Sequence, residues 1–208
     1  MRHELVIFDF DGTLADSGGW FFCSLNDVAD RFGFRRTTVE EREALRRLGS
    51  REIIRKLRVP IWKMPAIAAY MRRRATEDIE SIQLFEGVAP ALATLRRRGM
   101  KLAIVSSNAE QNVRTVLGPE LAELIDFYGC GSSLFGKAAK FRRAMKQLET
   151  SPERTICVGD EMRDIEAAKA VGASSAAVTW GYAAPEALRR LKPTLLLDQT
   201  VELGRLAG

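Results

Sequence analysis

The sequence predicts an α/β fold, with a parallel sheet covered by helices and a helical segment inserted after the first strand. Three observations support this prediction. Short apolar runs alternate with helical patterns through most of the 208 residues, this alternation stops between residues 15 and 84, and acidic or polar side chains follow several of the runs. Alternating strands and helices indicate a parallel sheet covered on both faces, because parallel strands are joined by crossovers that are usually helical.

The expected strands are six apolar runs, at residues 4–9, 101–106, 125–128, 154–158, 174–178 and 194–197. Helical patterns separate most of them, at residues 88–98, 110–117, 138–149, 161–171 and 185–191. Some of these helices carry end signals: Pro90 suits a first turn, and Gly99 and Gly172 are typical of the residue just after a helix.

Residues 15–84 break this rhythm and form a helical block. Helices are expected at residues 20–32, 40–48, 50–58 and 64–79. Leu25, Val28 and Phe32, for example, have the i, i+3, i+7 spacing of one helix face. We therefore expect an α/β core domain of residues 1–14 and 85–208, with residues 15–84 inserted as a helical cap domain over one edge of the sheet.

The composition is that of a globular protein, with 46% hydrophobic and 28% charged residues. No apolar run approaches the ~20 residues that cross a bilayer, and the N-terminus lacks a signal-peptide pattern, so we expect a cytoplasmic protein without membrane contact. The formal charge of +5 is uneven, because the segment from Arg31 to Arg74 carries +10. This excess either attracts an anion or marks solvated helix faces. A nucleic-acid partner is not expected, because aromatic residues do not alternate with the arginines.

The run from Asp9 to Leu14, DFDGTL, is the most informative motif and follows the first expected strand directly. Side chains at i and i+2 of a strand point to the same side, so Asp9 and Asp11 should face one small volume. In open α/β sheets the crevice outside the carboxyl ends of the strands binds ligands. Two carboxylates there need a cation, and Mg²⁺ prefers carboxylates, water and phosphate oxygens. Gly12 permits close approach of the backbone to a ligand.

Three further polar groups follow later strands. Ser106, Ser107 and Asn108 come after the second run, where hydroxyl and amide groups suit phosphate oxygens. Two lysines, Lys137 and Lys140, follow the third run, and a cation there can offset phosphoryl charge. The fourth run is followed by an acidic cluster: Asp160, Glu161 and Asp164.

These motifs, DFDGTLADS, IVSSN, GK and VGDEMRDIEAAKAVGA in this order, resemble the four motifs of the haloacid dehalogenase superfamily of phosphohydrolases. The resemblance covers essentially the whole chain. It implies a Rossmann-like core with a helical cap of the first type, and the closing run from Val178 resembles phosphoglycolate phosphatase-like members. The dehalogenase branch lacks an aspartate two residues after its nucleophile. Asp11 therefore places this chain with the members that transfer phosphoryl groups.

The resemblance implies catalytic roles for four residues. Asp9 would attack phosphorus and form an aspartyl-phosphate, and Asp11 would be the general acid and base. Ser106 would hydrogen-bond the phosphoryl group and Lys137 would neutralise its charge. The lysine of the family is often followed by proline, which is absent here, so Lys140 stays an alternative.

The resemblance also implies a magnesium site and supporting residues. Asp9, Asp160 and the main-chain carbonyl of Asp11 would hold Mg²⁺, and Asp164 with Glu161 would hold metal-bound water or orient the lysine. Contacts with the substrate are expected from Gly12, Thr13, Ser107, Asn108 and Arg51. Arg51, or alternatively Arg47, lies at the loop between two helices of the cap, where a guanidinium would meet a second anionic group, unless it simply faces solvent.

The leading functional prediction is a Mg²⁺-dependent phosphatase of a small phosphorylated metabolite, either phosphoglycolate-like or a sugar phosphate. One alternative is a phosphomutase of the β-phosphoglucomutase kind, which shares the nucleophile, the acid/base residue and the cap. Another is an inactive binding protein that uses the basic cap. The sequence leaves the substrate open, and it leaves open a monomer or a homodimer.

Overall fold

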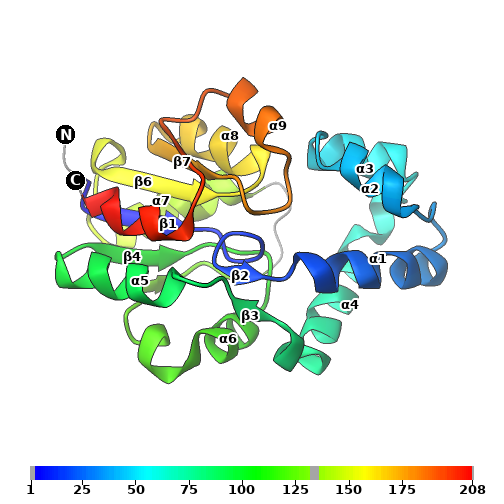
Figure 1. Ribbon diagram of the computed structural model, residues 1–208, viewed down its shortest axis with the longest axis horizontal. Coiled ribbons are helices and arrows are strands. Elements are labelled where there is room, and N and C mark those ends of the chain that lie inside the picture. The colour runs from blue at the N-terminus through cyan, green and yellow to red at the C-terminus, as the bar shows by residue number, and fades with distance from the viewer. Residues whose placement is uncertain (1–2, 132–135, 208) are drawn as a thin grey trace.

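The computed structural model describes residues 3–131 and 136–207. Its centre is a six-stranded parallel sheet with the order β5-β4-β1-β6-β7-β8 (Figure 1). The strands are β1 (Leu5–Phe8), β4 (Lys101–Ile104), β5 (Phe127–Tyr128), β6 (Thr155–Gly159), β7 (Ser174–Val178) and β8 (Leu195–Leu197). Each coincides with one of the six predicted runs, so the α/β fold is confirmed.

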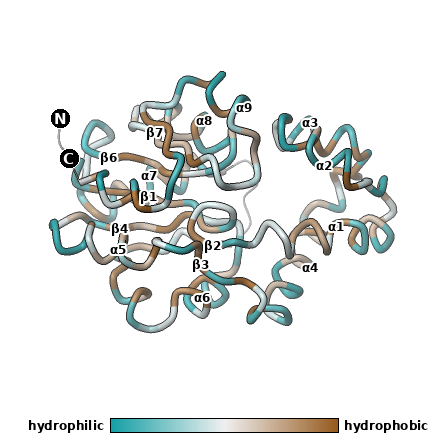
Figure 2. Tube along the Cα trace, viewed as in Figure 1, coloured by the Kyte–Doolittle hydropathy of each residue, from teal (hydrophilic) through white to brown (hydrophobic). Residues whose placement is uncertain are grey.

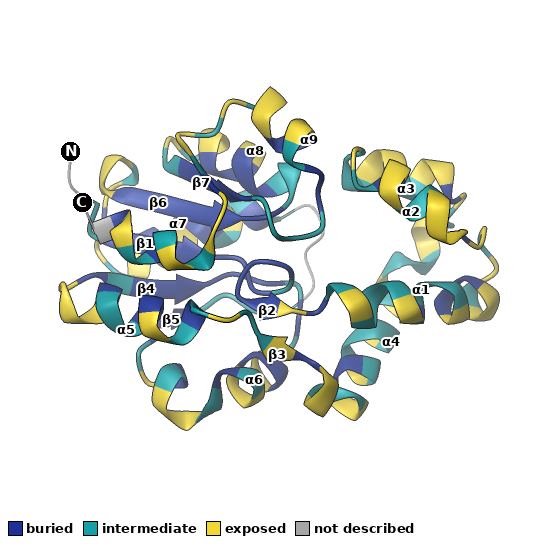
Figure 3. Ribbon diagram, viewed as in Figure 1, coloured by how far each residue is buried: buried dark blue, intermediate teal, exposed yellow. Residues whose placement is uncertain are grey.

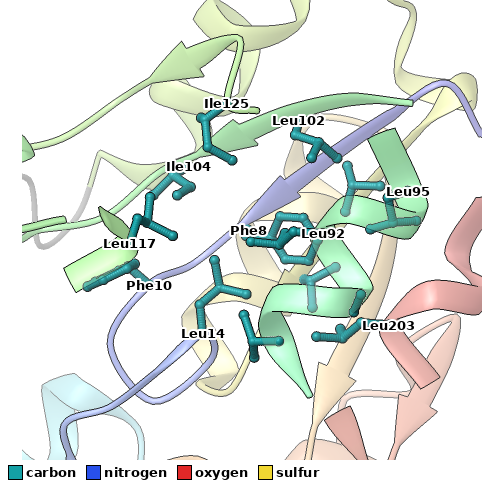
Figure 4. Close-up of a cluster of buried hydrophobic side chains, with 14 of the residues drawn as sticks. Phe8, Phe10, Leu14, Leu92, Leu95, Leu102, Ile104, Leu117, Ile125 and Leu203 are labelled. Atoms are coloured by element: carbon teal, nitrogen blue, oxygen red, sulfur yellow. The ribbon is translucent and has the colours of Figure 1, made fainter. Parts of the chain in front are cut away.

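The two faces of the sheet bury alternate residues of each strand. On β1, Val6 and Phe8 enter one hydrophobic cluster, while Leu5 and Ile7 enter another on the opposite face. This alternation explains the continuous apolar run, because a strand covered on both faces has no solvent-facing side. Figure 4 shows the first cluster, where Phe8 lies against Leu92, and Figure 2 shows hydrophobic residues concentrated along the strands.

Helices cover both faces of the sheet. They are α5 (Val88–Arg97), α6 (Glu110–Ala122), α7 (Lys137–Gln147), α8 (Met162–Ala170) and α9 (Pro185–Arg190), with 3₁₀ segments η3 (Pro152–Arg154) and η4 (Thr200–Ala207). Residues of α5, α6 and η4 pack on the face of Phe8, and residues of α7 and α8 pack on the face of Ile7. Gly99 and Gly172 follow α5 and α8 with φ of 79° and 78°, as the end signals predicted.

Helix α6 is longer than predicted. The predicted helix stops at residue 117, just before Gly118, where φ is 71° and ψ is 166°. A second helical stretch begins at Pro119 and continues to Ala122. The predicted helix therefore covers the part before the kink and misses the turn beyond it.

Segment 15–84 consists mainly of four helices: α1 (Gly18–Phe32), α2 (Val39–Leu45), α3 (Ser50–Lys56) and α4 (Met64–Glu77). Short 3₁₀ segments η1 (Ile61–Lys63) and η2 (Ile79–Ser81) flank α4. These four helices lie to one side of the sheet in Figure 1, and Figure 3 shows many exposed residues on them. None of the helices in the described part of the chain is long and apolar enough to cross a membrane.

The segment predicted as a helical block also contains two short strands that the sequence pattern did not predict. Its two ends pair as an antiparallel ribbon of β2 (Ala15–Asp16) and β3 (Gln83–Leu84), with Ala15 opposite Leu84. Strands of two residues leave no periodic pattern, so only the pairing reveals them. The ribbon holds the entry and exit of the segment side by side at the edge where β1 ends.

Candidate active site

Asp9 follows β1, the third strand of six, and its carboxylate is nearly inaccessible to solvent, at 3% exposure. One oxygen, Oδ1, accepts a hydrogen bond of 2.8 Å from the backbone N–H of Phe10. The other, Oδ2, lies 2.6 Å from Nζ of Lys137. Both oxygens are therefore held in place at the carboxyl edge of the sheet.

Lys137, the first residue of α7, is the lysine that meets Asp9. Its ammonium group forms ion pairs with Asp9 and Asp164. Burial lowers the pKa of Lys137, but these two carboxylates raise it, and the net pKa lies above its ordinary value. Lys140 instead donates to the carbonyls of Ser106, at 3.0 Å, and Gly131, at 2.7 Å. The geometry thus separates the two lysines that the sequence left as alternatives.

Asp11 is half-buried and faces the groups that follow β4. Ser106 Oγ donates to it at 3.4 Å, and Asn108 Nδ2 lies 3.2 and 3.3 Å from its two oxygens. The side chain of Asn112 donates to Asn108 Oδ1 at 3.0 Å, so the amide of Asn108 is oriented with its NH₂ toward Asp11. Burial and the charge of Asp9 raise the pKa of Asp11 to about 6, and its hydrogen bonds partly oppose the rise. A carboxyl group with this pKa exchanges protons near neutral pH.

Two further buried carboxylates lie beside that of Asp9. Oxygens of Asp9, Asp160 and Asp164 all lie within 4.8 Å of one another. Asp160 is fully buried, and it accepts hydrogen bonds from Thr13 Oγ1, at 2.7 Å, and from the backbone N–H of Tyr182, at 2.8 Å.

The cluster lacks enough positive charge from the protein itself. Lys137 pairs with Asp9 and Asp164, whereas Asp160 has no ion pair within the described residues. Burial and the neighbouring charges of Glu161, Asp9 and Asp164 raise the pKa of Asp160 well above its usual range. A hard divalent cation with oxygen ligands fits this set, because it would offset the repulsion that raises the pKa.

Two glycines allow the chain to close tightly on Asp160. Gly12 has φ of 77°, and a Cβ atom there would lie 2.4 Å from an oxygen of Asp160. A Cβ atom at Gly181 would lie 2.2 Å from Cβ of Asp160. Any side chain at either position would displace the carboxylate, so Gly12 shapes the acidic cluster as well as the loop.

Glu161 and Asp164 have different surroundings. Asp164 Oδ2 accepts a 2.9 Å hydrogen bond from the backbone N–H of Glu161, which fixes the first turn of α8. Its other oxygen meets Lys137. Glu161 instead reaches the cap, where Ser50 Oγ donates to it at 3.0 Å, and it forms an ion pair with Arg163. The structure thus brings Asp164 to the lysine and directs Glu161 toward the cap.

A cavity of about 330 Å³, which we call the cap cavity, lies between helices α1–α4 of segment 15–84 and the carboxyl edge of the sheet. We call this edge, which carries the carboxylates of Asp9, Asp160 and Asp164, the acidic edge. Asp11, Ser107 and Asn108 line it on the core side. Arg51, which was expected to contact substrate, is exposed on α3 and is not among the lining residues. Its predicted role stays a prediction.

Lining residues that were not assigned a role from the sequence include Arg46, Arg72, Arg163 and Tyr182. Tyr182 could have been found, because it follows β7 at the same sheet edge as the other motifs. Its ring lies 5.4 Å from that of Phe21, and its hydroxyl lies 2.6 Å from Ser17 Oγ. Arg163 also had a signal, because it lies inside the fourth motif, whereas Arg46 and Arg72 had none, because the cap holds many similar residues.

Comparisons with known proteins agree with this geometry. The family model for haloacid dehalogenase-like hydrolases matches residues 6–178. A phosphoglycolate phosphatase of Synechococcus elongatus is 35% identical over 205 residues, covering 96% of this chain and 95% of the relative. The tyrosine-protein kinase PtkA of Mycobacterium tuberculosis is 30% identical over 200 residues, covering 93% of this chain and 68% of the relative.

A solved structure extends the likeness to the whole fold. The crystal structure of CbbY from Rhodobacter sphaeroides, in complex with phosphate, has a TM-score of 0.74 and 26% identity. The match covers 98% of this chain and 97% of that one. The resemblance seen in the four motifs is therefore confirmed, and the chain belongs to the haloacid dehalogenase-like hydrolases.

Proposed function

We propose that this enzyme is a Mg²⁺-dependent phosphatase that hydrolyses a small phosphomonoester through an aspartyl-phosphate on Asp9. The observation that carries the proposal is the pairing of the Asp9 carboxylate with Lys137, 2.6 Å away, next to a second carboxyl group with a raised pKa. A nucleophile, a fixed cation and an acid/base group in one place are the parts that covalent phosphoryl transfer needs.

In the first step, an oxygen of Asp9 attacks phosphorus while Lys137 stabilises the charge on the carboxylate and the phosphoryl oxygens. Asp11, protonated below its pKa of about 6, gives its proton to the leaving alcohol oxygen. In the second step, the same carboxylate accepts a proton from the water that attacks the aspartyl-phosphate. Inorganic phosphate then leaves, and Asp9 and Asp11 return to their starting forms.

The acidic cluster supports a magnesium site. Asp9, Asp160 and the main-chain carbonyl of Asp11 would hold the ion, and Asp164 would hold its water or keep Lys137 in place. When bound, Mg²⁺ supplies charge neutralisation and aligns the phosphoryl group for in-line attack.

Two buried guanidinium nitrogens that find no hydrogen-bond acceptor in the described part of the chain support the proposal that the substrate is an anion. Nη1 of Arg72 and Nε of Arg163 are buried and have no hydrogen-bond partner among the described residues. Both residues line the cap cavity next to Ser107 and Asn108. Buried donors normally have acceptors, and phosphate oxygens are suitable ones. Phosphoglycolate, the substrate in the name of the Synechococcus relative, is the first compound to test.

Phosphate release from a panel of phosphomonoesters, with Mg²⁺ and with EDTA, tests the proposal. We expect turnover that requires Mg²⁺, and Asp9→Asn should remove it while Asp16→Asn, an exposed carboxylate on β2, should not. Full activity of Asp9→Asn would exclude the covalent mechanism. Formation of an isomer from a sugar phosphate, without phosphate release, would point to a phosphomutase instead.

A further inference from the structure

The cap cavity is polar at one end and apolar at the other. Its polar lining includes Asp11, Asn108 and Arg163, all from loops or helix starts at the carboxyl edge of the sheet. The polar residues that the cap contributes are Arg46, Ser50 and Arg72, and Arg72 lies beside Asn112, which donates to Asn108. Arg46 donates to the carbonyl of Tyr182 at 3.0 Å, and Ser50 donates to Glu161.

Apart from Arg46, Ser50 and Arg72, the lining residues from α1–α4 and their connections are apolar or aromatic among the described residues. Representative members are Leu25, Ile53, Ile54, Ile67, Ala68 and Met71. Four helices therefore contribute apolar side chains around one space instead of packing together completely. We call this part of the lining the apolar roof.

The volume is large for the leaving group of a two-carbon ester. An apolar cavity of about 150 Å³ holds one benzene molecule. The cap cavity, at about 330 Å³, thus has room for a phosphoryl group at its polar end and a body about the size of that ring under the roof. A two-carbon group would leave most of the roof facing water, which is unfavourable for apolar side chains.

The chemistry of the roof also disfavours a sugar. Each sugar hydroxyl buried there would lose its hydrogen bonds to water and find no polar partner among the apolar residues of the roof. An apolar body has no such loss and gains from contact with residues such as Ile53 and Met71.

We propose that the enzyme prefers phosphate monoesters of apolar alcohols, with a ring or a chain of about six carbons inserted under the apolar roof. This inference rests on the proposed phosphatase function and narrows its substrate class. The phosphoryl group lies at Asp9 and the ester oxygen faces Asp11. The apolar body then extends past the rings of Phe21 and Tyr182 into the cap.

A series of n-alkyl phosphates from methyl to hexyl, with phenyl phosphate, phosphoglycolate and glucose 6-phosphate, tests the inference on the native enzyme. We expect kcat/KM to rise about fourfold with each methylene group until the roof is filled. The ratio of kcat/KM for phenyl phosphate to that for hexyl phosphate then shows whether the roof prefers a ring or a chain. A flat or falling series, with phosphoglycolate hydrolysed fastest, would overturn the inference but leave the phosphatase function intact. Failure to hydrolyse any ester would overturn the proposed function itself.

A pair of substitutions on α4, one inside the apolar roof and one outside it, provides a matched test. Ala68 lines the cavity, whereas Ala69 is exposed on the same helix. Ala68→Phe should lower kcat/KM for hexyl phosphate at least tenfold more than for methyl phosphate, while Ala69→Phe should change neither. Equal loss for both esters, or no loss for either, would contradict the inference.

Competitive inhibition of the native enzyme by alkylphosphonates gives a readout that does not depend on a folded variant. These compounds resist hydrolysis, so their inhibition constants report binding alone. The constant should fall about fourfold per methylene from methyl- to hexylphosphonate. Inhibition that is independent of chain length would count against occupation of the roof.

Discussion

The acidic edge of the sheet and the interior of the cap are built on opposite principles. At the edge, buried charges are held by short contacts, as in the ion pair of Asp9 with Lys137 and the hydrogen bond of Thr13 to Asp160. In the cap, charged residues such as Arg51 lie outside, and the interior is an incompletely filled apolar space. Under the proposed function, this difference places the reaction chemistry at fixed positions along strand ends and the choice of substrate in the packing of short helices.

The largest expected effect is a difference in kcat between variants of Lys137 and Lys140, the two lysines at the acidic edge. Lys137→Met should lower kcat about 10²–10³-fold, because it removes a cation that acts on the charge developing in the reaction. It should also destabilise the fold, since it leaves Asp9 and Asp164 buried without a counter-charge. Lys140→Met removes hydrogen bonds to two backbone carbonyls and should have a much smaller effect on kcat. Phosphate-release kinetics and urea unfolding of both variants check this, and a larger loss of kcat in Lys140→Met would reverse the assignment.

A smaller effect is expected where the cap meets the core. Arg46 donates to the carbonyls of Tyr182, at 3.0 Å, and Gly181, at 3.3 Å. Arg46→Ala should weaken this contact and lower kcat/KM about tenfold, the effect of losing roughly 1.4 kcal/mol of charge-assisted hydrogen bonding. The exposed neighbour Arg47→Ala is the matched control.

Arg51→Ala belongs in the same kinetic comparison, because the sequence predicted contact between Arg51 and an anionic substrate. Suppose that kcat/KM of Arg51→Ala falls selectively for acidic esters, while Arg46→Ala has nearly native kcat/KM. The anionic group of the substrate is then recognised on α3 rather than where the cap contacts the core. The opposite pattern would support the arrangement seen here, in which Arg51 is exposed.

The last expected effect is on folding stability, with no change in catalysis needed to detect it. The folded pKa of Asp11, about 6, lies above the unfolded value of about 3.9. The native state therefore binds the proton more tightly, and ionised Asp11 destabilises the fold increasingly as pH rises from about 4 to above 6. Asp11→Asn, which stays neutral, should be more stable than the native protein by up to about 3 kcal/mol at pH 7, and the difference should shrink to about 0.5 kcal/mol near pH 4.

Urea unfolding in EDTA at both pH values measures this difference. The control is Asp16→Asn, which removes an exposed carboxylate from the neighbouring ribbon strand. A stability gain for Asp11→Asn that is equal at pH 4 and pH 7 would show that ionisation of Asp11 does not strain the native state.

Much of the core could be predicted because its signals are local. The buried strands are continuous apolar runs, helix ends carry Gly99 and Gly172, and polar groups follow strands that share one edge. The roles given to Asp9, Asp11 and Asp160 stay predictions for the proposed experiments, although the structure brings all three to one place.

Other features have no local signal. The ribbon that joins Ala15 to Leu84 depends on residues about 70 positions apart, and Glu161 meets Ser50 only because the cap lies over α8. The contact of Tyr182 with Asp160 likewise needs β7 to lie beside β6. Pairings of this kind are set by packing, which the pattern of a single segment does not record.

The sequence by itself determined the α/β class, the helical insert and the acidic motif at the end of β1, because alternation and strand-end position are properties of consecutive residues. Only the tertiary structure decided that Lys137 rather than Lys140 meets Asp9. It alone also showed the cap cavity, with its apolar roof facing the acidic edge. The space that four helices leave between them depends on their angles and side-chain packing, and these arise only when distant segments come together.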